Sequence, residues 1–504
     1  MQTSAIRHAL FRRPSVGLIV TVVVAGLFVA APAGAVPTCA FDEGTATVTI
    51  EVGEAETATI GRSGDAITLD ASACDTATVL NVDAIVVNGT GTPAAVVIDL
   101  AGGPFAPGLT VEADGSSEIE FTINLPTGSP ILRILGSPGA EDIVAGATEV
   151  NLNAVEPADD ADVLIVGLPS VVIEGGAGED RLSVTGGSGT SGPSSAQLDG
   201  GTEGDLLFAA GANNTIAGGD GLDTVDYTAA SQLLLASLQI GTVQHGSGQI
   251  DLIAGVENLT GSPGADTIVG TDEANVLLGG DGGDTLVGEG GDDLLDGQGG
   301  IDTVDLSGSP APVRVILPAH SATGDGIDRL EGIENAIGSI FSDQMVGDDG
   351  ANRLDGLDGN DRIEGAGGDD HLDGGAGIDT ADFGLSKEGV TVNLKAGSAT
   401  GAGTDVLANF ENVSGSGGDD TIAGNAGPNQ IGGGDGDDTI EGGSGDDRIK
   451  GGSNADRLLG QAGNDVLSAG PGFDQLNGGK GNGDHCRGGA EADSFVFCES
   501  LTLN

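Results

Sequence analysis

The chain has 504 residues and is acidic and rich in glycine, with 93 Gly, 77 Asp and Glu, 17 Lys and Arg, and a formal net charge of −60. With only 12 Phe, one Tyr and no Trp, it lacks the large side chains that fill a broad globular core, whereas a thin stack of repeated coils needs only small aliphatic residues inside. The charge argues against nucleic acid or an anionic membrane as partner and favours bound divalent cations.

Residues 1–35 are predicted to be a signal peptide rather than part of the fold. Basic residues precede an apolar run from Val16 to Ala31, and Ala33-Gly34-Ala35 offers a cleavage site. The alternative is an uncleaved membrane anchor, but the run is short for a span and ends in small residues. We therefore expect a secreted, extracellular protein with no membrane span after cleavage.

The four cysteines fit an exported protein. Cys39 and Cys74 lie near the predicted mature N-terminus, and Cys486 and Cys498 lie near the C-terminus. Three pairings are possible, and a local disulfide at each end is the economical one.

Residues 36–135 are predicted to form a β-rich N-terminal section. Short runs alternate apolar and polar residues, most clearly from Glu118 to Leu125, and Gly, Pro and Asn separate the runs. This section could be a small sandwich or the irregular start of a β-helix, and we favour the second. Residues 136–199 form a transition with degenerate repeats, and the Gly-, Ser- and Pro-rich stretch Gly186–Ser195 is the candidate flexible loop.

From Gly200 onward the chain repeats every nine residues. Between Gly415 and Asn477 it reads GSGGDDTIA, GNAGPNQIG, GGDGDDTIE, GGSGDDRIK, GGSNADRLL, GQAGNDVLS and AGPGFDQLN. Each unit opens with turn-forming residues, has Asp or Asn sixth and has Ile or Leu eighth. Similar units occupy 200–226, 261–305 and 338–382. The glycines permit a turn, the Asp adds an anionic oxygen, and the aliphatic residue faces inward on a very short strand.

These units resemble the RTX, or haemolysin-type, calcium-binding nonapeptide G-G-x-G-x-D-x-U-x, in which U is a large aliphatic residue. The resemblance implies an all-β fold, a right-handed parallel β-helix or β-roll in which one coil takes two units. It also implies that several Ca²⁺ ions lie between stacked turns, held by backbone carbonyls and by the sixth-position Asp of units i and i+2.

We therefore predict a set of metal ligands that share the sixth position of a unit. They are Asp205, Asp223, Asp266, Asp284, Asp293, Asp302, Asp343, Asp361, Asp370, Asp379, Asp420, Asp438, Asp447, Asp456, Asp465 and Asp474. Bridging by units i and i+2 gives nine pairs with Asp on both sides: 205/223, 266/284, 284/302, 343/361, 361/379, 420/438, 438/456, 447/465 and 456/474.

Four units have Asn at the sixth position: Asn214, Asn275, Asn352 and Asn429. Because Asn keeps the side-chain oxygen but loses the charge, the pairs 275/293, 352/370 and 429/447 are expected to be weaker calcium sites. The pair at Asp343 is also in question, since its unit GSIFSDQMV lacks most of the glycines. The alternative for any isolated unit is an Asp that merely caps a turn.

The spacers between the groups repeat as well, because Glu257-Asn258, Glu334-Asn335 and Glu411-Asn412 are each 77 residues apart. We interpret the spacers as wider coils of the same stack. Residues 200–486 would then be one roll of repeats with spacers, and residues 487–504 its C-terminal cap.

The sequence favours a calcium-binding protein over an enzyme. It contains neither H-E-x-x-H nor G-x-S-x-G, and we predict no catalytic residue. A calcium-dependent adhesin or surface-layer component, with an unknown cell-surface or matrix partner, is one alternative. A hydrolase with an active site in residues 36–199 is another.

Overall fold

The computed structural model describes most of the chain after residue 35. The described residues are 36–43, 45–53, 56–80, 82, 84–89, 95–102, 120–124, 131–137, 142–145, 149–151, 163–166, 170–184, 195–209, 213–245, 248–489 and 491–502. The predicted signal peptide and almost all of the predicted loop Gly186–Ser195 lie outside them.

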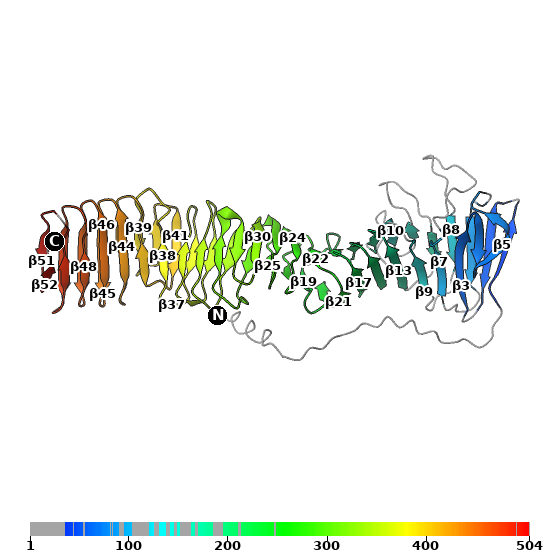
Figure 1. Cartoon of the computed structure of the whole chain (residues 1–504), viewed down its shortest axis with the longest axis horizontal. Helices are drawn as coiled ribbons and strands as arrows, with labels where there is room; N and C mark the ends of the chain where they lie inside the picture. Colours follow the sequence, from blue (N-terminus) through cyan, green and yellow to red (C-terminus); the bar gives the residue numbers. More distant parts are fainter. Residues whose placement is uncertain are drawn as a thin grey trace.

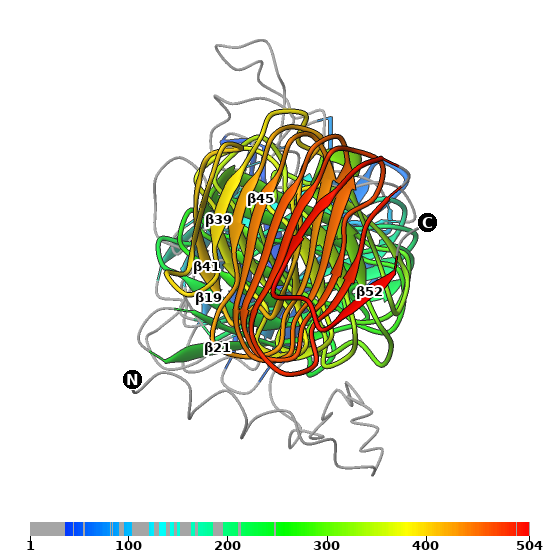
Figure 2. The same cartoon turned by 90° about the vertical axis from the view of Figure 1, so that its left-hand side faces the viewer.

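Short β-strands wind into a long rod made of two sheets, which we call sheet A and sheet B (Figure 1). Along the repeats, consecutive strands pass alternately to sheet A and sheet B, and each strand pairs in parallel with a strand one full coil further on. In the view along the rod the coils lie over one another (Figure 2). The fold is therefore an all-β solenoid of the β-roll type.

The repeats supply strands to both sheets. In sheet A these are β14 (Arg181–Ser183), β16 (Leu206–Phe208), β18 (Thr224–Asp226), β22 (Asn258–Thr260), β24 (Val276–Gly282), β26 (Leu294–Gly300), β32 (Gln344–Val346), β35 (Arg362–Glu364), β38 (Thr380–Asp382), β42 (Asn412–Ser414), β44 (Gln430–Asp435), β46 (Arg448–Ser453), β48 (Val466–Ser468) and β50 (His485–Arg487). In sheet B these are β13 (Ser170–Ala177), β15 (Ala196–Thr202), β17 (Thr215–Asp220), β23 (Thr267–Val269), β25 (Thr285–Val287), β27 (Thr303–Asp305), β31 (Asn335–Ile337), β33 (Arg353–Asp355), β36 (His371–Asp373), β43 (Thr421–Ala423), β45 (Thr439–Ser444), β47 (Arg457–Ala462) and β49 (Gln475–Lys480). A small third sheet pairs β34 (Asp358–Gly359) with β37 (Ala376–Gly377) in the turns.

The strand register confirms a coil of two nonapeptides. Thr421 pairs with Thr439 and Thr439 pairs with Arg457 in sheet B, so partners lie 18 residues apart in the chain. Residue seven of each unit therefore lies over residue seven two units later, and the same holds for the buried eighth residue.

The eighth residue of each unit forms the core. Ile431, Ile449 and Leu467 follow one another along sheet A, and each is at most 1% exposed. Burying one such side chain stabilises the fold by about 1.5–3 kcal/mol. The thin core needs no aromatic residue, which accounts for the composition.

The N-terminal section belongs to the same two sheets. In sheet A it contributes β1 (Thr38–Asp42), β2 (Thr47–Val52), β6 (Ala84–Gly89), β8 (Glu120–Asn124), β12 (Val163–Val166), β11 (Glu149–Asn151) and β10 (Asp142–Ala145), the last of which pairs with β14. In sheet B it contributes β5 (Ser72–Thr78), β4 (Ala66–Leu69), β3 (Thr57–Ser63), β7 (Ala95–Asp99) and β9 (Ile131–Leu135), which pairs with β13. Both sheets thus run on from this section into the repeats (Figure 1).

Each spacer places three antiparallel strands in one sheet. The first consists of β19 (Leu234–Ser237), β20 (Thr242–His245) and β21 (Gln249–Ala254) in sheet B. The second consists of β28 (Arg314–Ile316), the 3-10 helix Leu317–Ala319, β29 (Ser321–Thr323) and β30 (Ile327–Glu331) in sheet A. The third consists of β39 (Thr391–Asn393), β40 (Ser398–Thr400) and β41 (Thr404–Ala408) in sheet B.

The spacers therefore stay within the two sheets, although not as the single wider coils that we expected. In the second spacer, β30 pairs with the preceding array strand β26, and β28 pairs with the following array strand β32. The chain runs ahead, reverses twice and returns. Both sheets stay continuous because the reversal fills the gap with paired strands.

A disulfide lies near each end of the rod, and both pairings that we expected are present. Cys39 in β1 is bonded to Cys74 in β5, which links the first strands of sheets A and B. Cys486 in β50 is bonded to Cys498, between the last two strands, β51 (Ser494–Val496) and β52 (Ser500–Thr502). Phe495 packs against the core, while Phe497 is 68% exposed.

Truncating one core residue should weaken the roll. Ile449→Ala removes a fully buried side chain and should cost about 2–5 kcal/mol, whereas Arg448→Ala on the exposed face of the same strand should change stability by less than about 0.5 kcal/mol. Urea unfolding in saturating calcium measures both. Equal effects of the two substitutions would contradict this assignment of the core.

Candidate metal centre

All 16 predicted ligands are buried at the turns, directly before the strands. None is more than 4% exposed. They form two columns along the rod, one beside each sheet. Column A precedes strands of sheet A and contains Asp205, Asp223, Asp293, Asp343, Asp361, Asp379, Asp447 and Asp465. Column B precedes strands of sheet B and contains Asp266, Asp284, Asp302, Asp370, Asp420, Asp438, Asp456 and Asp474.

Within a column, each carboxylate is joined to the coil before it. The backbone N–H of Asp438 donates to Oδ1 of Asp456 at 3.0 Å, and the N–H of Asp456 donates to Oδ1 of Asp474 at 2.9 Å. All nine predicted Asp pairs and the three pairs headed by Asn have this contact, at 2.7–3.0 Å. The structure thus stacks every predicted pair as neighbours.

The second carboxylate oxygen, Oδ2, is buried without a hydrogen-bond partner in 13 of the 16 residues. These are Asp205, Asp223, Asp284, Asp293, Asp302, Asp361, Asp370, Asp379, Asp438, Asp447, Asp456, Asp465 and Asp474. A buried anionic oxygen with no partner is costly. A cation is the group that would satisfy it.

Burial raises the pKa of these carboxyls, and the neighbouring carboxylates add to the effect. The pKa of Asp438 rises to about 7, first because of burial and then because Asp420 and Asp456 lie next in the column. The pKa values of Asp293, Asp361, Asp370 and Asp456 also rise to about 7. The columns therefore resist ionisation unless positive charge is supplied.

Three predicted ligands differ, because a serine four residues earlier satisfies both of their oxygens. The Oγ–H of Ser416 donates to Oδ1 of Asp420 at 2.6 Å, and its N–H donates to Oδ2 at 2.7 Å. Ser262 with Asp266 and Ser339 with Asp343 show the same arrangement. Each of these Asp residues opens a group of repeats directly after a spacer.

The sixth-position Asn residues after the spacers are also satisfied by protein groups. In Asn429, Nδ2 donates to the Glu411 carbonyl at 2.5 Å, and Oδ1 accepts the N–H of Asn425 at 2.9 Å. Asn275 and Asn352 make equivalent bonds. Their amides serve as hydrogen-bond donors, a role that our expectation of weaker calcium ligands did not include.

The Glu-Asn pairs of the spacers have a structural role in the same columns. Oε2 of Glu334 accepts the N–H of Asp302 at 2.8 Å, and Oδ1 of Asn335 accepts the N–H of Arg353 at 2.8 Å. The pairs at 257 and 411 do the same. These longer side chains continue the backbone contacts where a spacer replaces an Asp unit.

Further members of the columns were missed because they lie outside the motif. The N–H of Asp180 donates to Oδ1 of Asp205, and the N–H of Asp465 donates to Oδ1 of Asp484. The unit GGAGEDRLS, which contains Asp180, and the one-residue shift at Asp484 were visible in the sequence. Asp251, Asp328 and Asp405 had no such sign, because they follow hairpins of the spacers.

Glycine at the first position of a unit leaves room beside the unpaired oxygens. A Cβ at Gly433 would lie 2.1 Å from Asp438 Oδ2 and 2.7 Å from the Gly451 carbonyl oxygen. The same pair of oxygens borders Gly200, Gly279, Gly356, Gly442 and Gly460. Carboxylate and carbonyl oxygens converging without nitrogen or sulfur match the donor set of Ca²⁺.

The comparison with protein families agrees with this geometry. The model of the RTX calcium-binding nonapeptide repeat matches residues 158–190, 197–229, 269–304, 346–381, 414–449 and 450–484. The chain is therefore an RTX nonapeptide-repeat protein, and the matches begin upstream of residue 200, where we expected the roll to start. RTX nonapeptide repeats bind calcium, which makes Ca²⁺ a ligand of this chain. No curated protein gave a significant match.

Filling the space at one first-position glycine should block calcium binding there. Gly433→Ala places a methyl group against Asp438 Oδ2, whereas Gly432→Ala has no atom within 4 Å of its Cβ. We expect the first variant to need roughly tenfold more calcium to fold, equivalent to about 1.4 kcal/mol, and the second to behave as wild type. Calcium titration followed by circular dichroism tests this, and equal midpoints would contradict it.

Without calcium, the roll should be more stable at pH 5 than at pH 8. Asp438 has an ordinary pKa of 3.8 and a pKa of about 7 in the fold, so between these values the folded chain holds a proton that the unfolded chain has released. This stability is complete below the ordinary pKa and is lost as the pH rises through the raised one.

Far-UV circular dichroism in calcium-depleted buffer should accordingly show more β-structure at pH 5. Saturating calcium should reverse the trend, because binding requires the deprotonated carboxylates. More β-structure at pH 8 than at pH 5 in the absence of calcium would contradict the expectation.

Proposed function

We propose that this protein is a secreted calcium-binding protein whose β-roll folds on binding several Ca²⁺ ions between stacked turns. The observation that carries the proposal is the double column of buried Asp carboxylates with one oxygen left unpaired. Calcium supplies the positive charge and the oxygen coordination that these carboxylates lack. The ligands would be the 13 Asp residues with an unpaired Oδ2, together with first-position carbonyls.

The chain's own contribution is to bring the oxygens together. The eighth-position aliphatic residues fix the height of each coil, and the N–H of one Asp holds Oδ1 of the next, which leaves Oδ2 directed away from that bond. The glycines keep side chains out of the space beside it. In the unfolded chain these oxygens are apart and hydrated, so binding and folding are coupled.

Export fits a protein that folds on calcium. The predicted signal peptide 1–35 would direct the chain out of the cell, and the two disulfides fit an oxidising environment. No helix among the described residues is long and apolar enough to cross a membrane. Extracellular calcium would meet sites expected to have dissociation constants of about 10⁻⁴–10⁻³ M, so the roll would form after export.

The parts of the chain would then have distinct roles. Residues 36–135 and the transition 136–199 would form the N-terminal start of the stack. Residues 200–486 would bind calcium, and residues 487–504 would close the C-terminal end. The N-terminal strands are stacked without columns of sixth-position Asp and are linked by the disulfide Cys39–Cys74, so this start is expected to need less calcium than the repeats.

Calcium titration of the chain beginning at Val36 tests the proposal. Far-UV circular dichroism should change from coil to β near millimolar calcium, and magnesium should not replace calcium because it keeps its waters and demands a compact octahedron. Denaturant m-values in calcium should match a large folded unit. A β spectrum that is unchanged by chelator at neutral pH would contradict calcium-coupled folding and would favour the adhesin reading.

A further inference from the structure

One Asp occupies the same place in all three spacers. Asp251, Asp328 and Asp405 each lie in the third spacer strand, opposite Val243, Ala322 and Ala399 of the preceding strand. Each is at most 4% exposed. They do not belong to a nonapeptide unit, and Asp328 and Asp405 lie outside the residues that match the RTX family.

In the second spacer, the turn before Asp328 reproduces the stacking of an ordinary coil. The N–H of Asp293 donates to Oδ1 of Asp328 at 3.1 Å, and the N–H of Ile327 donates to the side chain of Asp292 at 2.9 Å. The N–H of Arg329 donates to the carbonyl of Asp293 at 2.8 Å. The pair Asp438 and Asp456 makes the same three contacts with its neighbours.

The third spacer repeats these contacts in the opposite column. The N–H of Asp370 donates to Oδ1 of Asp405 at 3.2 Å, and the N–H of Thr404 donates to the side chain of Asp369 at 2.9 Å. A separation of 35 residues in the chain thus gives the arrangement that 18 residues give elsewhere. The hairpin loops out and returns Asp405 to the column in register.

The upper residue of each of these two pairs has an unsatisfied buried oxygen. Oδ2 of Asp293 and of Asp370 lacks a hydrogen-bond partner, and each residue is 3% exposed. A Cβ at Gly288 or Gly365 would lie 2.3 or 2.2 Å from these oxygens, so the space beside them is free of side chain. The charged groups that act on Asp293 are all acidic, namely Asp328, Asp325 and Asp292.

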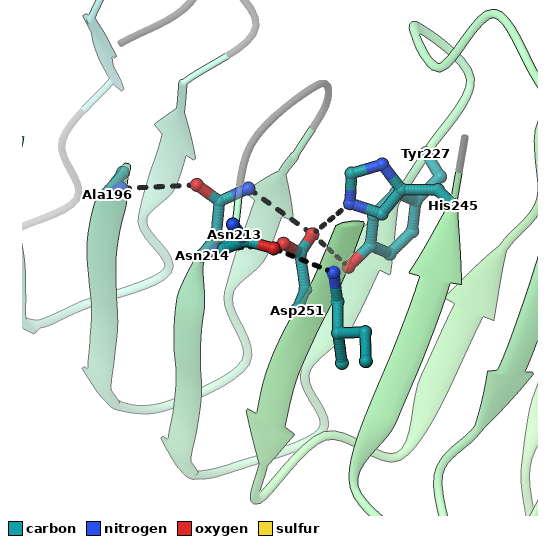
Figure 3. Close-up of polar contacts among 7 residues, drawn as sticks. Ala196, Asn213, Asn214, Tyr227, His245 and Asp251 are labelled. Carbon is teal, nitrogen blue, oxygen red and sulfur yellow. Dashed lines mark hydrogen bonds and ion pairs between the residues drawn. The ribbon is translucent and has the colours of Figure 1, made fainter. Parts of the chain in front are cut away.

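The first spacer satisfies the equivalent position with protein groups alone (Figure 3). Asn214 takes the place of Asp293 and Asp370, and its N–H donates to Oδ1 of Asp251 at 2.6 Å. Oδ2 of Asp251 accepts the Tyr227 hydroxyl at 2.9 Å and the Asn214 amide at 3.3 Å, and His245 Nε2 lies 3.2 Å away. All these residues are nearly or fully buried.

The residues that surround Asp251 are absent from the other two spacers. Leu306 and Phe383 begin those spacers where Tyr227 begins the first. By strand pairing, Gly324 and Gly401 stand where the first spacer has His245. Where the column keeps Asp above Asp, the polar partners are missing, and where it has Asn above Asp, Tyr and His are present. The two arrangements are alternative ways of compensating one buried carboxylate.

We propose that the second and third spacers each bind a further Ca²⁺ ion, at Asp293/Asp328 and at Asp370/Asp405, and that the first spacer is closed at the equivalent position by Tyr227, His245 and Asn214 and binds none. The inference rests on the proposed calcium function of the columns. It extends the bound ions across the spacers, where the nonapeptide motif is interrupted.

The test counts bound calcium in the full chain from Val36, by metal analysis after gel filtration at a calcium concentration that just saturates wild type. The variants are Asp328→Asn, Asp405→Asn and their double variant, with Asp251→Asn as matched control. Asn keeps the size and one oxygen, so the fold should persist, and circular dichroism checks this. Asp284→Asn, within a regular group, is the control for the columns themselves.

We expect each of Asp328→Asn and Asp405→Asn to lose one ion and the double variant to lose two. Asp251→Asn should keep the wild-type count while lowering the unfolding temperature, because Tyr227 and His245 lose their anionic partner. Wild-type counts in the spacer variants together with a loss in Asp284→Asn would overturn this inference and leave the proposed function intact. Wild-type counts in all variants would overturn both.

If a variant fails to fold, terbium luminescence gives a second measurement. Adding Tb³⁺ to the folded wild type and to Asp328→Ala at limiting lanthanide should show fewer bound ions in the variant. An equal number of bound Tb³⁺ ions in the two folded proteins would overturn the site at Asp293/Asp328.

Discussion

The structure depends on the cost of taking carboxylates out of water in a regular array. Each coil buries its sixth residue at the turn, and the next coil places another acid 18 residues on in the same column. Like charges at such spacing repel strongly in a medium of low dielectric constant, and a buried ion without a partner loses its hydration. The backbone can donate only one N–H to each carboxylate, so one oxygen remains for a cation.

The remaining features of the roll make this array possible. Glycine turns allow coils to stack closely enough for carbonyls and carboxylates to converge; Gly436, for example, has a φ of +118° and would place a Cβ 2.5 Å from the Gly418 carbonyl. One aliphatic residue per unit gives a continuous but thin core. Such a core gives each coil little stability of its own. Neighbouring coils and bound ions must therefore supply the rest, and the two disulfides secure the coils that have a neighbour on one side only.

Much of this could be read from the sequence because the repeats are local. A period of nine with Asp sixth and Ile or Leu eighth determined the 18-residue coil, the buried core and the pairing of Asp456 with Asp438. The disulfides followed from the positions of the cysteines. The behaviour of Asp266, Asp343 and Asp420 did not follow, since a motif that marks the Asp says nothing about a serine hydroxyl four residues earlier. Asp328 and Asp405 were also missed, because only the antiparallel hairpin returns them to the column.

The 77-residue repeat has a consequence for the shape of the rod. Asn258 lies in sheet A, its equivalent Asn335 lies in sheet B, and Asn412 lies in sheet A again. One repeat thus contains an odd number of half-coils, and successive spacers emerge on opposite faces. Loss or gain of a single repeat during evolution would keep every strand paired, yet it would rotate everything downstream by half a turn. Proteins of this design can change length by one repeat only by inverting the surface that their far end presents.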